Sequence, residues 1–99
     1  MTIELENVRI VKKHQQYKES TEYAVFLDYK GFAYRLDWEL ADNTGIDPQE
    51  ASSLMRIQIE ADLSDELLLR EISTTPAGAS KRYNEYLDNG WELTDLTLN

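Results

Sequence analysis

Ten residues of alternating apolar and polar side chains constrain the fold of this chain more than any other feature. Residues 31–40 read Gly-Phe-Ala-Tyr-Arg-Leu-Asp-Trp-Glu-Leu, so every second side chain is large and apolar. A period of two places these side chains on one face of a β-strand and the charged ones on the other. Residues 22–29 alternate in the same way, and Lys30-Gly31 supplies a two-residue turn between the runs. The sequence therefore predicts a β-hairpin.

Shorter patterns on either side of this hairpin predict a first strand and a connection. Residues 3–10 also alternate, but the pattern slips by one position near Asn7, which is typical of a β-bulge. Polar residues from 14 to 21 then lead into the hairpin, and residues 41–46 are expected to form a loop after it.

A helix is predicted to start near residue 48. Asp47 can cap it, Pro48 suits its first turn, and Glu50 follows three residues after the cap. Its extent is ambiguous, because residues 55–63 alternate as a strand would. We favour a short helix followed by a strand, and one helix over roughly residues 48–62 is the alternative.

The remainder of the chain is expected to contain a break, a second helix and a closing strand. Residues 64–66 are predicted to be a turn or a helix cap, and residues 67–73 a return strand or one short helix. A Thr-Thr-Pro-Ala-Gly stretch then breaks the chain. Helical spacing predicts a helix over about residues 78–89, which Asn89-Gly90 would end, and residues 91–98 are typical of a strand.

These elements predict one α+β domain that comprises residues 1–99. We expect an antiparallel sheet of four to six strands, with the C-terminal helix (about 78–89) packed on one face and a shorter helix starting near residue 48. With 99 residues, the chain has the size of a single domain. It contains no cysteine, so packing alone must hold the fold, without disulfides or thiolate-bound metal.

Side chains that carry chemistry are scarce. His14 is the only histidine and lies in a polar stretch, where we expect a solvated residue and not a general base. There is no cysteine nucleophile, no glycine-rich phosphate loop and no Cys/His cluster for zinc. A calcium loop with Gly45 at its sixth position would need an acid at Leu40, so that motif fails. We therefore predict no enzymatic activity, no cofactor and no metal.

Net charge excludes several classes of partner. Ten basic and 19 acidic side chains give a formal charge of −9, which disfavours direct binding to nucleic acid or to an anionic membrane. No apolar run approaches the roughly 20 residues that span a bilayer. Residues 1–7 carry two glutamates where a signal peptide needs a basic and then an apolar run. The expected compartment is the cytoplasm.

The excess negative charge is concentrated in the middle of the chain, where residues 36–79 hold ten acidic and two basic side chains. Carboxylates on one strand face would lie about 6.5 to 7 Å apart, roughly the spacing of phosphates along a nucleic-acid strand. The sequence therefore favours a non-enzymatic protein-interaction module that binds a protein with a basic surface. It could be an inhibitor that occupies a nucleic-acid-type groove, as short acidic proteins of phages and mobile elements do; the likeness is in composition alone. The candidate partner-binding residues are Asp37, Glu39, Glu60, Asp62, Asp65, Glu66 and Glu71.

Three alternatives stay open. The acidic residues can serve solubility alone, since charge runs are usually solvated faces. The chain can instead be a subunit of a larger assembly, including a homo-oligomer, that pairs through its sheet edge. The third alternative is a small-molecule-binding or hydrolytic domain with a pocket between sheet and helix. Phe32, Tyr34 and Trp38 are expected in the core and not on an RNA-stacking surface, and Trp91 is expected to cover one end of that core.

Overall fold

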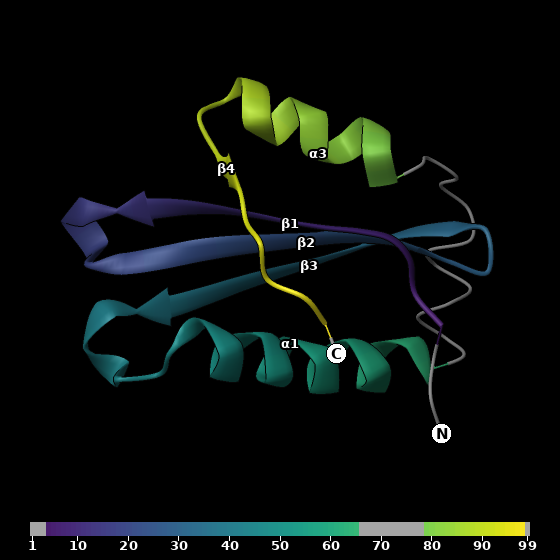
Figure 1. Ribbon diagram of the computed structural model, residues 1–99, viewed down its shortest axis with the longest axis horizontal. Helices are drawn as coiled ribbons and strands as arrows, with labels where there is room; N and C mark the ends of the chain where they lie inside the picture. Colours follow the sequence, from purple (N-terminus) through teal and green to yellow (C-terminus); the bar gives the residue numbers. More distant parts are fainter. Residues whose placement is uncertain (1–3, 66–78, 99) are drawn as a thin grey trace.

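A four-stranded antiparallel sheet separates two helices, which lie on its opposite faces (Figure 1). The computed structural model describes residues 4–65 and 79–98. The elements, in chain order, are β1 (Glu6–Gln15), η1 (Gln16–Lys18), β2 (Ser20–Tyr29), β3 (Phe32–Ala41), η2 (Asp42–Thr44), α1 (Pro48–Leu63), α3 (Ala79–Asp88) and β4 (Glu92–Leu93). The strand order is β3-β2-β1-β4, which confirms the predicted α+β class and antiparallel sheet. Within the described ranges, neither helix is long and apolar enough to span a bilayer.

The predicted hairpin is confirmed as β2 and β3. These strands pair without interruption from Tyr29↔Phe32 to Ser20↔Ala41. Lys30 and Gly31 have φ values of 50° and 83°, so both turn residues are left-handed. This is the type I′ geometry, whose twist matches that of the flanking strands and which glycine adopts without strain.

The bulge in the first strand is confirmed as well. Asn7 has a φ of 54°, and the pairing of β1 with β2 shifts register between Glu6 and Arg9. Beyond the bulge, Ile10 and Val11 point to opposite faces and are both almost fully buried. Each face of β1 therefore contributes to a different core.

Two cores result, one on each side of the sheet. The α1-side core is built from buried residues of both helix and sheet, with the C-terminal segment added: Ile10, Tyr23, Val25, Leu27, Tyr34, Ala51, Met55, Ile59, Leu63 and Leu98. The α3-side core is smaller, with Val11, Ala24 and Phe26 packed against Tyr83, Tyr86, Leu87 and Trp91. The predicted core position of the hairpin aromatics is confirmed for Tyr34, which is buried, while Trp38 packs against the α1-side core and is only half-buried.

The strand predicted over residues 55–63 is wrong, because one helix occupies the whole region. α1 has 16 residues and is longer than α3, which has ten. As predicted, Asp47 caps it: the backbone N–H of Glu50 donates to the Asp47 carboxylate over 2.9 Å. The apolar alternation was misleading because Ile57 points to solvent and is 65% exposed. The buried positions follow the helical repeat instead, at Ala51, Met55, Ile59 and Leu63.

The closing strand is much shorter than predicted. Only Glu92–Leu93 is a strand, paired with β1, and the amide of Thr94 extends the contact by donating to the Ile10 carbonyl over 2.9 Å. The chain then leaves the sheet edge and passes toward α1 (Figure 1), where Leu96 and Leu98 pack on the α1-side core. Burial of these leucines, not continuation of the ladder, determines the path.

The ends of the helices follow the predicted signals where they are described. Ser64 caps the C-terminus of α1, since its backbone N–H and its hydroxyl both donate to the Glu60 carbonyl. Gly90, with a φ of 90°, follows α3 as the predicted left-handed stop. The element predicted over residues 67–73 and the break that follows it lie outside the described residues.

Candidate functional site

The structure divides the candidate acids between the two faces of the sheet. Asp37 and Glu39 project from β3 on the face that carries α3, whereas Glu60, Asp62 and Asp65 lie on α1 or just after it, on the other side. Glu66 and Glu71 lie outside the described residues. The described acids therefore form two groups and not one row. The expected row depended on a strand over residues 55–63, where α1 is found instead.

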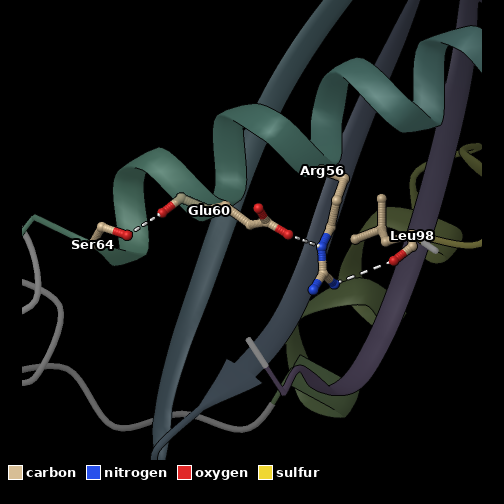
Figure 2. A network of polar contacts seen from close by, with 4 residues as sticks. All are labelled: Arg56, Glu60, Ser64 and Leu98. Atoms are coloured by element: carbon tan, nitrogen blue, oxygen red, sulfur yellow. Dashed lines mark hydrogen bonds and ion pairs between the residues drawn. The ribbon is translucent and has the colours of Figure 1, made fainter. Parts of the chain in front are cut away.

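The acids of α1 make contacts that hold the fold. Figure 2 shows the Arg56 guanidinium between α1 and the C-terminal segment. Its Nε donates to Glu60 Oε1 over 2.6 Å, and its Nη1 donates to the Leu98 carbonyl over 3.2 Å. Glu60 thus orients an arginine that ties residue 98 to the helix.

Asp62 has a similar structural role. Its carboxylate accepts hydrogen bonds from the Tyr34 hydroxyl, over 2.5 Å, and from the Gln58 side-chain amide, over 2.8 Å. Burial, and then the hydrogen bond to Asp62, raise the pKa of Tyr34 well above its usual range. The contact joins α1 to β3.

On the opposite face, three acids and two aromatic residues line a cavity of about 410 Å³. Glu22 from β2 and Asp37 and Glu39 from β3 lie on one side of the cavity. Tyr86, near the end of α3, and Trp91, between α3 and β4, lie on the other side. Tyr23 and Trp38 complete the lining, although their side chains belong to the opposite face of the sheet. We refer to this site as the acidic–aromatic groove.

The two aromatic residues are held in place by the α3-side core. The Tyr86 ring lies 5.0 Å from Phe26 and 5.0 Å from Trp91, both in edge-to-face geometry. The amide of Trp91 donates to the Tyr86 carbonyl over 3.1 Å. In addition, Arg35 Nη1 donates to the Tyr86 hydroxyl over 3.0 Å, which joins α3 to β3 beside the groove.

The carboxylates of the groove are unequally compensated. Glu22 and Glu39 lie directly opposite each other on neighbouring strands, an arrangement in which like charges are destabilising. Glu22 has Lys18 at 3.6 Å and Lys13 opposite it on β1, and Asp37 lies 3.1 Å from Arg35. Glu39 forms no ion pair with any residue that the structure describes.

One cation beside the groove, Lys18, interacts with Tyr17 and, more weakly, with two of the carboxylates. The pKa of Lys18 is raised, first by Tyr17 and then by Glu22 and Glu39. None of the described residues that line the groove is itself basic. The groove is therefore negative in charge and aromatic on one wall.

Such a lining is suited to an organic cation. Carboxylates form short, charge-assisted hydrogen bonds with ammonium and guanidinium groups, and aromatic rings attract the same cations through their faces. Residues 4–65 and 79–98 contain no group of three or more His, Cys, Asp or Glu placed to hold a metal ion. The groove can thus accept a lysine or arginine side chain.

Five side chains define the groove, and two of them, Asp37 and Glu39, were predicted as binding residues from the sequence. Glu22 could have been added, because the predicted hairpin already places it opposite Glu39. Tyr86 and Trp91 carry no such signal, since helical spacing does not say which face of a sheet a helix covers.

His14 lies apart from the groove, near the end of β1. Its Nε2 is 2.8 Å from Asp42 Oδ2, and its side chain is 49% exposed. The contact joins β1 to the turn after β3. His14 is thus a partly exposed residue near the end of a strand, as expected from the sequence.

Comparison with known proteins adds no relative. No protein-family model matches the chain, and neither the curated proteins nor the solved structures include a match.

Proposed function

We propose that this chain is a non-enzymatic protein-interaction module whose acidic–aromatic groove binds a basic segment of a partner protein. The observation that carries the proposal is the meeting of Glu22, Asp37 and Glu39 with Tyr86 and Trp91 around one cavity. A lysine or arginine side chain entering it would contact carboxylates on one side and aromatic rings on the other.

Repulsion between Glu22 and Glu39 supports this assignment. Two carboxylates directly opposite each other weaken the pairing of β2 with β3. Lys18 forms its ion pair with Glu22, and Glu39 forms none with any described residue, although Lys18 attracts it from farther away. A cation bound between Glu22 and Glu39 would replace repulsion by attraction. Binding would therefore also raise the free energy of unfolding.

The partner class follows from the same chemistry. A protein with a nucleic-acid-type basic surface presents such side chains, so the chain could act in the cytoplasm as an inhibitor of the kind that phages and mobile elements encode. We locate this binding on the α3 face, because Glu60 and Asp62 are already engaged in contacts that hold α1 in place. The acids of α1 are not required for it.

The test is peptide binding by fluorescence anisotropy, with a labelled hexa-arginine peptide as probe and hexa-glutamate as the negative control. We expect the Glu22→Gln/Glu39→Gln variant to bind hexa-arginine at least about tenfold more weakly, because charge-assisted hydrogen bonds contribute roughly 1.5 to 3 kcal/mol. The matched control is Glu85→Gln/Asp88→Asn, which removes the same charge from exposed positions on α3. This control should bind nearly as tightly as the unmodified protein.

Two outcomes would reject the groove as the binding site. One is an equal loss of affinity in both variants, which would assign binding to overall charge. The other is the absence of hexa-arginine binding at low salt. Affinity capture from host lysate is a separate experiment that can identify the partner. A partner held by charge should be captured at low salt and lost at about 1 M salt, where the Debye length falls to about 3 Å.

A further inference from the structure

One long edge of the sheet is unpaired among the described residues. β3 is the last strand in the order β3-β2-β1-β4, and it has ten residues that pair with β2 on one side only. Its register shows no bulge. Proteins usually shorten, bend or cover such an edge, because its free N–H and C=O groups can pair with another strand.

The sequence of this edge is complementary to itself. In an antiparallel pairing of two β3 strands centred on Leu36, Arg35 lies opposite the Asp37 of a second copy, and the reciprocal pair repeats the contact. On the other face, Tyr34 lies opposite the second copy's Trp38. We propose that β3 pairs in this way with β3 of a second copy of this chain, across a two-fold axis at Leu36. The two four-stranded sheets then form one sheet of eight strands.

Neighbouring registers are less favourable. Centring the pair on Arg35 places two arginines opposite each other, and centring it on Asp37 places two aspartates opposite each other. Like charges in directly opposite positions destabilise a strand pair, and unlike charges stabilise it. The Leu36 register contains only unlike charge pairs, and it pairs every residue from Phe32 to Leu40.

An exposed apolar flank on α1 supports the same partner. Leu54 is 43% exposed and Ile57 is 65% exposed, three residues apart on the helix. At 100° per residue, Leu54 lies about 160° around the helix from Arg56, which faces the C-terminal segment. Asp62, which bonds Tyr34 of β3, marks the opposite flank. Leu54 therefore points toward the side of α1 that borders the β3 edge.

The geometry of the paired sheet brings these flanks together. A two-fold axis perpendicular to the sheet leaves both α1 helices on the same face, one on each side of the junction. The Leu54 side chains of the two helices then both point toward the junction, which would lower their exposure to water. Backbone pairing, charge complementarity and apolar burial all point to a second copy of the chain.

The test is the solution mass, measured by sedimentation equilibrium over a range of concentrations. The unmodified protein should approach twice the 11.5 kDa of one chain. Arg35→Asp and Asp37→Arg each place like charges opposite each other in both pairs, so each variant alone should dimerise at least about tenfold more weakly. An equimolar mixture of the two variants restores both unlike pairs and should form a heterodimer. Glu85→Arg makes the same change of charge as Asp37→Arg at an exposed position on α3, and it should remain dimeric.

A cysteine cross-link tests the register. The chain has no cysteine, so Leu36→Cys introduces a single thiol next to its own copy at the axis. Mild oxidation should give a covalent dimer. Leu40→Cys is the matched control, being a half-buried leucine on the same strand and face, and it should not cross-link because its copy lies at the far end of the pair.

The proposal is overturned by a monomeric mass at every concentration, by equal cross-linking of the two cysteine variants, or by open-ended oligomers. A monomer whose β3 amides all resist hydrogen exchange would show that this chain covers its own edge. The Glu22→Gln/Glu39→Gln variant should lose peptide binding and remain dimeric, so dimerisation and groove binding can fail independently.

Discussion

Tyr34 illustrates how one buried side chain links stability to pH. Its side chain is 6% exposed, and its hydroxyl donates to Asp62 across the contact between β3 and α1. Because burial raises the pKa of Tyr34 in the folded protein, the unfolded chain loses this proton first, near the usual value of about 10. The stability that this tyrosine contributes is therefore present below about pH 10 and is lost as pH rises further.

We expect Tyr34→Phe to lower the free energy of unfolding by roughly 1 to 2 kcal/mol at neutral pH, through loss of the hydrogen bond. The difference in free energy of unfolding between Tyr34→Phe and the unmodified protein should become smaller above about pH 10. There, ionisation of Tyr34 in the unfolded chain destabilises only the unmodified protein. Urea unfolding at several pH values measures both effects. Tyr17→Phe, at a position 78% exposed, is the control. A difference that stays constant with pH would contradict the linkage.

Helices and strands whose pattern lies within one continuous segment could be predicted from the sequence. The contacts between them could not, because those depend on how the elements pack. The hairpin was predictable because its alternation and its turn lie within one continuous segment. α1 was predicted at its start, where the cap is local. The favoured interpretation ended the helix too early because Ile57 carries an apolar side chain to the surface, and the structure instead confirms the alternative of one helix over roughly residues 48–62. The aromatic side of the groove was missed for a related reason: Tyr86 and Trp91 meet the acids only through tertiary packing.

The cap of α1 allows a direct test of one local contact. Asp47→Ala removes the side chain that accepts the N–H of Glu50, and it should lower the free energy of unfolding by about 1 kcal/mol. Asp47→Ser keeps an acceptor in place and should retain most of that stability. Chemical denaturation of the two variants provides the comparison, and equal losses would show that the cap contributes little.

The electrostatics of the whole molecule are set by a formal charge of −9 on 99 residues. This total follows from composition, but only the structure separates the acids of α1 from those of β3, because strand or helix geometry decides which side chains share a face. Between described residues, three ion pairs join Lys or Arg to an acid. Self-repulsion should therefore exceed the attraction within these pairs.

Added salt should raise the melting temperature, because screening at about 0.5 M weakens repulsion between exposed acids more than it weakens a few surface ion pairs. A thermal melt in sodium chloride, from about 0.02 to 0.5 M, tests this. Peptide binding in the groove should weaken over the same range. A melting temperature that falls with salt would show that ion pairs outweigh repulsion.

The eight residues from Trp91 to Leu98 contact both sides of the sheet: Trp91 packs in the α3-side core, and Leu96 and Leu98 pack in the α1-side core. A single proteolytic cut at the exposed Asp95 would therefore break a segment that packs in both cores. Neither α1 nor α3 would keep its full packing afterwards. The two layers are consequently expected to lose order together, in one calorimetric transition, although each has its own set of buried side chains.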